Sequence, residues 1–235
     1  MSGISGISGY NSSDMYGRIA SGTRIQRAGD DPAGQAIASK METQQRTQAM
    51  QQRNAAEQRD AINIADGARA GITGYVQDMN VLSVQAMNGL YSDSDRQAIQ
   101  NQINQYSMGI NDLAGQARYN ETSVLAGTSA RSLGVENFDV RGGSADMSTI
   151  DGALSSVSGS RASDGAAANG LSAAISNLGN AGENTTAGQS RIEDLDVAEA
   201  VSELKKEETL NQVSVDMQKR QMEDQKNLMN QMFGA

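Results

Sequence analysis

The chain has 235 residues, a formal net charge of −9, no histidine and no cysteine. The acidic balance excludes a protein that binds nucleic acid by neutralising phosphates, the missing basic clusters argue against docking on anionic lipid, and no run approaches the roughly 18 apolar residues of a membrane span. Without His and Cys the chain lacks the commonest acid–base group and every thiolate ligand, so we expect no enzyme, no metal site and no cofactor.

The apolar content is thin, and much of it is alanine. Ile, Leu, Val and Phe together make up about 17% of the chain, which has two Phe and no Trp. Alanine is the best helix former and is small enough for close contact between helices. The composition therefore predicts helices with narrow apolar seams that finish their burial against neighbouring subunits, rather than a thick globular core.

The first segment is rich in Gly and Ser and carries only sparse apolar positions, at Ile4, Ile7, Met15 and Ile19. A sharp helix start follows it. Asp31 is a good N-cap because its carboxylate accepts free backbone N–H groups, and Pro32 loses no hydrogen bond at the first helical position. The sequence therefore predicts that a helix begins here.

From Ala33 to about Asn88 the sequence predicts one long helix, because apolar residues recur every three or four positions, as in a coiled coil. These positions are Ile37, Met41, Ile62, Ala65, Ala68, Ile72, Val76, Met79, Leu82 and Ala86. A helix of this span is about 80 Å long at roughly 1.5 Å per residue. A second helix begins at Ser92 in the manner of a capping box and extends to about Tyr119.

The following segment contains scattered Gly and short β-prone runs such as Val135–Val140, and it predicts a small β-hairpin near 120–145. From Ile150 the helical pattern returns, interrupted by glycines, and a final helix is expected from about Thr185 nearly to the chain end. Each apolar seam needs a partner, and the other end of the chain is the closest candidate. The expected fold is mainly α, with long antiparallel coiled-coil helices from both chain ends and a small β-hairpin element.

Four blocks of the chain resemble bacterial flagellin, in the order in which that family carries them. Residues 17–41 (GRIASGTRIQRAGDDPAGQAIASKM) are similar to its N-terminal motif, and residues 82–103 (LSVQAMNGLYSDSDRQAIQNQI) are similar to its next conserved block. Residues 119–125 (YNETSVL) resemble the start of its β-hairpin, and residues 183–212 (ENTTAGQSRIEDLDVAEAVSELKKEETLNQ) resemble its C-terminal block. The chain resembles a short flagellin that lacks the outer variable domains.

The resemblance implies a non-enzymatic structural subunit of the flagellar filament, which polymerises with copies of itself through its N- and C-terminal helices for motility. It implies export by the flagellar type III apparatus to an extracellular filament. The implied partners are an export chaperone, the filament cap and hook-junction proteins. The implied domains are an N-terminal inner-core segment (1–32), a coiled-coil domain (33–182) and a C-terminal helix that completes the coiled coil and the inner core (183–235).

Three other functions compete with this one. A hook–filament junction protein shares the terminal motifs but usually has a bulkier middle. A lipid-binding amphipathic protein would need cationic flanks and wide apolar faces. An enzyme would have to use the acidic run of the C-terminal half, which a solvated helix face or pairing with a neighbouring subunit explains more simply. That run comprises Glu193, Asp194, Asp196, Glu199 and Glu203.

Charged residues of the two end blocks and methionines of the tail are the candidates for contacts between subunits. They are Arg24, Arg27, Asp30, Arg191, Glu193, Asp194, Met222, Met229 and Met232. The Met- and Gln-rich tail replaces the Leu-rich ending that is usual in the family, so the inner ends should differ from those of a typical flagellin. At helical spacing we expect Met41, Met79 and Met217 in the coiled-coil core, and the last three Met in the core or at a subunit interface.

Many flagellins are recognised by Toll-like receptor 5 through the helix before the SVQA stretch and the helix after it. The matching positions here are Asp78, Asn80, Leu82, Gln85 and Gln102. Those flagellins have an Arg-rich surface beside the Leu that matches Leu82; the two Arg positions hold Asp78 and Asn80 here, and Gln102 replaces an acidic residue. The loss of charge-assisted bonds predicts weak receptor binding and weak signalling.

Overall fold

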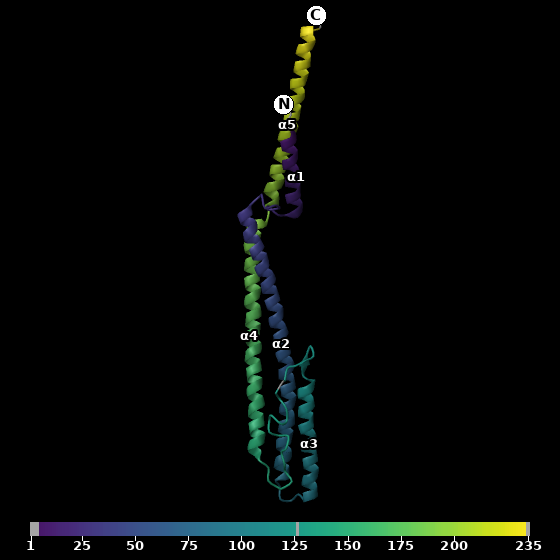
Figure 1. Cartoon of the computed structure of the whole chain (residues 1–235), viewed down its shortest axis with the longest axis vertical. Coiled ribbons are helices and arrows are strands. Elements are labelled where there is room, and N and C mark those ends of the chain that lie inside the picture. Colours follow the sequence, from purple (N-terminus) through teal and green to yellow (C-terminus); the bar gives the residue numbers. More distant parts are fainter. Residues whose placement is uncertain (1–4, 126, 234–235) are drawn as a thin grey trace. The chain divides into compact units, whose positions relative to one another are not determined.

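The computed structural model describes the backbone of residues 5–125 and 127–233 and the side chains of residues 13–125 and 127–232. Within these residues the chain forms helices and one small antiparallel sheet (Figure 1). The elements are α1 (Ser5–Ser21), α2 (Pro32–Ala86), α3 (Asp93–Gln116), β1 (Arg118–Tyr119), β2 (Thr122–Ser123), α4 (Met147–Glu193) and α5 (Val197–Phe233). The mainly α fold is confirmed, while the positions Ile4 and Ile7 lie outside the described side chains.

The chain divides into two compact units. The first, called the end unit below, comprises residues 1–47 and 182–235, and the second, the middle unit, comprises residues 48–181. Helices α1 and α5 belong to the end unit, and α3 and the sheet belong to the middle unit. Helices α2 and α4 contribute residues to both.

Helix α2 begins where the sequence predicts it. The Asp31 carboxylate accepts the backbone N–H of Gly34 at 2.8 Å, and Pro32 is the first helical residue. The helix then continues for 55 residues to Ala86. Its C-terminus is stabilised in part by Arg96 of α3, whose Nε donates to the Ala86 carbonyl at 3.1 Å. This carbonyl has no partner within the helix.

The seam of α2 is apolar in the middle unit and more polar toward its N-terminal half. Ile72, Val76 and Met79 are fully buried, and Met79 is the core residue that its spacing predicts. In the end unit the buried position is Ala38, whereas Ile37 is 47% exposed, so the expected place of Ile37 in the seam is wrong by one residue. The seam steps by three or four residues from position 38, and position 37 falls beside it.

Helix α3 packs antiparallel on α2 within the middle unit. Its start is a capping box, in which the Asp95 N–H donates to the Ser92 hydroxyl and the Ser92 N–H donates to the Asp95 carboxylate. Tyr75 of α2 stacks on Tyr106 of α3 with ring centroids 5.7 Å apart. Gly109 lies against this pair, and a Cβ at position 109 would lie 3.1 Å from the Tyr75 ring, so a larger residue would require the ring to shift slightly.

The β-hairpin is short and tight. Strands β1 and β2 pair antiparallel, and the two loop residues Asn120 and Glu121 have φ values of 46° and 67°. Positive φ at both central residues is the requirement of a type I′ turn, which matches the twist of the strands that it joins. The small hairpin element expected from the sequence is present.

The β-prone run 135–140 forms no strand. It lies in irregular chain whose side chains Val135, Phe138 and Val140 are buried in the core of the middle unit. Its backbone is held instead by the buried Gln100 of α3, whose amide donates to the Phe138 carbonyl and accepts the Val140 N–H, both at 2.8 Å. One polar side chain thus does what a neighbouring strand would do.

Helix α4 is the antiparallel partner of α2. In the middle unit Arg161 donates to Asp66 at 2.8 Å, and in the end unit Gln189 accepts from Gln45 at 2.7 Å. Residues with higher numbers on α2 therefore contact residues with lower numbers on α4, as antiparallel helices require. The buried anchors of α4 are Ile150, Ala153 and Val157 at its N-terminal end.

Two expectations about the C-terminal half are wrong. The glycines at 159, 165 and 170 do not interrupt α4, because the cost of roughly 1 kcal/mol for a helical Gly is small beside tertiary packing. The final helix is not continuous either: α4 ends at Glu193 and α5 begins at Val197. Asp196 caps α5 by accepting its first backbone N–H groups. As a result α2 pairs with α4, whereas α5 packs against α1.

The Gln100 contact generates a stability prediction. Gln100→Leu should lower the free energy of unfolding by about 2–4 kcal/mol, because it leaves a buried carbonyl and a buried N–H without partners. Gln97→Leu on the exposed side of the same helix is the matched control and should change it by less than about 0.5 kcal/mol. Urea unfolding followed by circular dichroism measures both, and equal effects of the two substitutions would contradict the role assigned to Gln100.

Candidate assembly surface

The link between α1 and α2 is joined to the link between α4 and α5 by main-chain bonds within the end unit. Arg24 N–H donates to the Glu193 carbonyl at 2.6 Å, and Leu195 N–H donates to the Gly22 carbonyl at 3.0 Å. Thr23 and Asp194 form an antiparallel bridge between them. These paired links, residues 22–31 and 193–196, are called the joint below.

Charged side chains reinforce the joint. The Arg24 guanidinium donates to the Ile192 carbonyl at 2.8 Å and lies 3.6 Å from the Asp31 carboxylate. Arg27 pairs with Asp14 of α1 at 3.2 Å. These contacts connect the N-terminal link both to α1 and to the end of α4.

Asp30 closes the turn that precedes α2. Its carboxylate accepts the backbone N–H groups of Gln26 and Arg27 at 3.0 and 3.1 Å, and it pairs with Arg18 at 3.1 Å. The backbone N–H groups of Gln26 and Arg27, and to a lesser degree Arg18, lower the pKa of Asp30 below its ordinary 3.8. Asp30 therefore acts inside the link, one residue before the N-cap.

The charged interface candidates are thus mostly engaged within the chain. Arg24, Arg27 and Asp30 hold the joint, Asp194 accepts the Ser190 hydroxyl, and Glu193 accepts from Gln189 at 2.7 Å. Arg191 is exposed. A contact of these side chains with a second subunit stays a prediction, whereas their part in setting the geometry of the end unit is visible.

Helix α5 carries an uncovered apolar face. Ala200 and Leu204 are buried, but every described side chain from residue 212 to residue 232 is exposed. The large apolar side chains on this stretch are Val213, Val215, Met217, Met222, Leu228, Met229 and Met232. Met217 is 60% exposed, so its expected place in the coiled-coil core is wrong, because α1 extends along only the first part of α5. A helical stretch with this many exposed large apolar side chains is typical of a surface that another molecule covers.

The positions that match the receptor surface lie on α2 and α3 in the middle unit. Asp78, Leu82 and Gln85 are spaced by four and three residues and share one helix face, whereas Asn80 points about 160° away from Asp78. Asp78 and Gln85 are exposed, Leu82 is half-buried, and Gln102 is exposed on α3. The α2–α3 contacts at either end of this stretch put Gln102 at the level of these residues.

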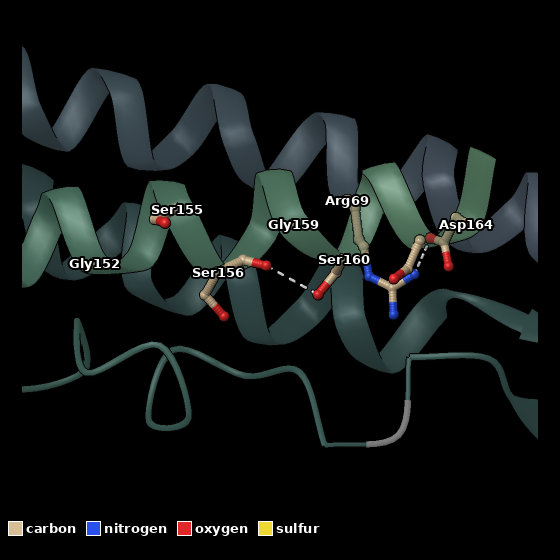
Figure 2. Close-up of a pocket in the computed structure, with 8 residues that line it drawn as sticks. Arg69, Gly152, Ser155, Ser156, Gly159, Ser160 and Asp164 are labelled. Carbon is tan, nitrogen blue, oxygen red and sulfur yellow. Dashed lines mark hydrogen bonds and ion pairs between the residues drawn. The ribbon is translucent and has the colours of Figure 1, made fainter. Parts of the chain in front are cut away.

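A polar groove lies along α4 in the middle unit. Figure 2 shows Arg69 of α2 reaching Asp164, with a row of small residues beside them; the two form an ion pair. The groove has a volume of about 630 Å³ and is lined by Arg69, Gly152, Ser155, Ser156, Gly159, Ser160, Ser163 and Asp164. The Ser160 hydroxyl donates to the Ser156 carbonyl at 2.9 Å, within its own helix. The one carboxylate of the lining, that of Asp164, is paired with Arg69.

The described part of the chain has neither a cluster of metal-binding side chains nor a helix suited to cross a membrane. In that part of the chain no three His, Cys, Asp or Glu side chains gather as they would around a metal ion. Across the same residues, none of the helices combines the length and hydropathy that a membrane span requires.

The fold and the uncovered helix define a class: an α-helical structural protein that completes its burial by assembly. The family comparisons agree with it. Residues 7–130 match the bacterial flagellin N-terminal helical region, and residues 147–232 match the bacterial flagellin C-terminal helical region. The chain belongs to the bacterial flagellin family.

Relatives extend over most of the chain. A flagellar filament 31.3 kDa core protein of Treponema maltophilum is 30% identical, with 85% of each chain covered. A flagellin of Bacillus subtilis is also 30% identical, with 84% of each chain covered. A flagellar filament 41 kDa core protein of Borreliella burgdorferi is 37% identical over 53% of this chain and 37% of its own.

The lowered pKa of Asp30 predicts a pH response of the joint. Since the pKa is lower in the folded chain, ionised Asp30 stabilises the link above about pH 4, and this contribution is lost as the pH falls through the lowered value. We expect the Gln26 and Arg27 amide hydrogens to lose protection from exchange in that range, after correction for intrinsic rates. Asp30→Ala should remove their protection at all pH values, because it deletes the acceptor oxygen, and Asp14→Asn should leave it intact. Unchanged protection in Asp30→Ala would contradict the role of Asp30.

Proposed function

We propose that this protein is a structural subunit of the bacterial flagellar filament and that it polymerises through its terminal helices for motility. The uncovered apolar face of α5 carries the proposal, because so many large apolar side chains exposed to water are unfavourable in an isolated chain and favour contact with another molecule. Membership of the flagellin family and the filament core proteins among the relatives support it. In this proposal residues 1–32 form the N-terminal inner-core segment, residues 33–182 form the coiled-coil domain, and residues 183–235 complete both the coiled coil and the inner core.

The partners and the location follow from the same proposal. The main partner is a second copy of the chain in a helical homopolymer outside the cell. Export by the flagellar type III apparatus, an export chaperone and a filament cap are proposed on the flagellin family alone. The proposed role is structural and includes no catalytic activity.

The alternative role is that of a hook–filament junction protein. A Bacillus subtilis flagellin matches 84% of this chain, which favours the filament role. If this chain had the bulkier middle of a junction protein, a smaller share of it would match. Copy number separates the two roles: a filament subunit dominates a preparation of sheared flagella, whereas a junction protein is a trace component. A trace amount beside another abundant flagellin would favour the alternative.

Charge on the α5 face should prevent assembly. Met229→Glu places an anion on a side chain that is 61% exposed in the monomer and is buried in the proposed filament, where an unpaired charge is very costly. We expect at least about a tenfold rise in the protein concentration needed for filaments, measured by sedimentation and electron microscopy. Met108→Glu on α3, where the side chain is 59% exposed, is the matched control and should assemble. Normal filaments of Met229→Glu would contradict burial of this face.

Receptor recognition of the α2–α3 surface should be weak. The exposed Asp78 carries a negative charge where a cation would be needed, and Asn80 offers no charge-assisted bond. In a Toll-like receptor 5 reporter assay we expect purified monomer to give a low response and the double variant D78R/N80R to give a higher one. Full activation by the unchanged monomer would contradict this proposal.

A further inference from the structure

The exposed face of α5 concentrates oxidisable side chains. Among the described methionines the four of α5 are the most exposed: Met217 is 60%, Met222 63%, Met229 61% and Met232 71% accessible. Met79, in the core of the middle unit, is 0% accessible. Met50, Met87 and Met108, outside α5, are 52%, 47% and 59% accessible. The four most accessible of the described thioethers thus share the one helix whose burial the proposed assembly requires.

We propose that Met217, Met222, Met229 and Met232 form a reversible modification site, at which a peroxide oxidises the unassembled subunit and thereby blocks its polymerisation. The proposal rests on the proposed function, since it takes α5 to be buried between subunits. In the filament the same side chains are covered, so the site is open only before assembly.

The chemistry needs no group from the protein beyond the thioether. The sulfur lone pair attacks one oxygen of hydrogen peroxide, the O–O bond breaks, and a proton moves to the departing oxygen. The products are methionine sulfoxide and water, with the sulfur oxidised and the peroxide reduced by two electrons. Exposure decides the relative rates, because a buried thioether is reached only when the chain opens.

The effect of oxidation follows from what surrounds these sulfurs. Met222, Met229 and Met232 line one hollow of the α5 surface with Leu228, Gln225 and Lys226. Oxidation turns three apolar walls of this hollow into polar, chiral groups that need hydrogen-bond donors when they are buried. A leucine at the same positions has similar volume and hydrophobicity and cannot be oxidised, so it separates the chemistry from the packing.

The first experiment maps the oxidation on the full chain. Purified monomer is treated with hydrogen peroxide, and peptide mass spectrometry gives the rate of sulfoxide formation at each methionine. We expect the α5 methionines to react at least about ten times faster than Met79 in the monomer, and to be protected in assembled filaments. Equal rates at α5 and Met79 in the folded monomer would overturn the proposal, and so would unprotected α5 methionines in intact filaments.

The second experiment measures assembly. The variant M50L/M87L/M108L removes the exposed methionines outside α5, and we expect its polymerisation to be lost after peroxide treatment and restored by methionine sulfoxide reductases. The variant M217L/M222L/M229L/M232L should polymerise before and after the same treatment. Retained assembly of the first variant after its α5 methionines are oxidised would overturn the proposal, as would loss of assembly in the second variant after treatment. Circular dichroism checks that both stay helical.

The design separates this proposal from the proposed function. If untreated protein of the natural sequence forms no filaments, the proposed function fails, whatever the oxidation rates are. If it forms filaments that peroxide-treated monomer also forms, only the modification site fails. If the leucine variant of α5 does not assemble before treatment, the reductase arm with M50L/M87L/M108L still decides the question.

Discussion

Most of the structure depends on how the single seam of α2 is covered. Along 55 residues one side of this helix has to be removed from water, and the chain supplies different covers in turn. Helix α3 and the irregular segment before α4 cover Ile72, Val76 and Met79 completely, whereas α4 meets a stretch in which Gln45, Gln48 and Gln52 are only half-buried. Since apolar burial contributes roughly 25 cal/mol per Å², the stability of the chain is concentrated in the middle unit.

The end unit is built on less burial and more polar geometry. Its buried side chains include Ile25, Ala38, Ala200 and Leu204, and much of its order comes from hydrogen bonds of the joint and from the pairing of α1 with α5. Tyr16 of α1, for example, donates to Glu208 of α5 at 2.5 Å on an exposed surface. A unit of this kind gains most when an outside surface is added to it, which suits a protein that completes itself by assembly.

The sequence predicted those features that local chemistry decides. Asp31 with Pro32 and Ser92 with Asp95 mark helix starts, and their capping bonds are present in the structure. The break between α4 and α5 carries a local signal of the same kind, because Asp196 accepts the backbone N–H groups of Ala198 and Glu199 as an N-cap. With neither Gly nor Pro in residues 194–196, this break was nevertheless missed. It is made by pairing with residues 22–24, roughly 170 positions away along the chain, and a single sequence carries no signal for such a contact.

The site residues divide along the same line. The sequence shows that Met222, Met229 and Met232 are apolar, but it does not show whether another helix covers them. Coverage of a helix face depends on where the partner helix ends. For this reason Met217 was predicted in the core, whereas it is exposed. Arg24, Arg27 and Asp30 were chosen for a contact between subunits, yet the fold engages them within one chain. Charged residues near a chain end suit either use equally well, and only the three-dimensional neighbours decide.

The joint has a consequence for how this protein can vary. Its two crossing bonds run between main-chain atoms, from Arg24 N–H to the Glu193 carbonyl and from Leu195 N–H to the Gly22 carbonyl. Main-chain hydrogen bonds do not depend on the identity of the side chain, with two exceptions. Proline at position 24 or 195 would remove a donor, and the φ of 71° at position 22 favours glycine there. Apart from Arg24, Arg27 and Asp30, whose side chains also hold the joint, residues of this short region can therefore change their surface chemistry while the path of the backbone is kept.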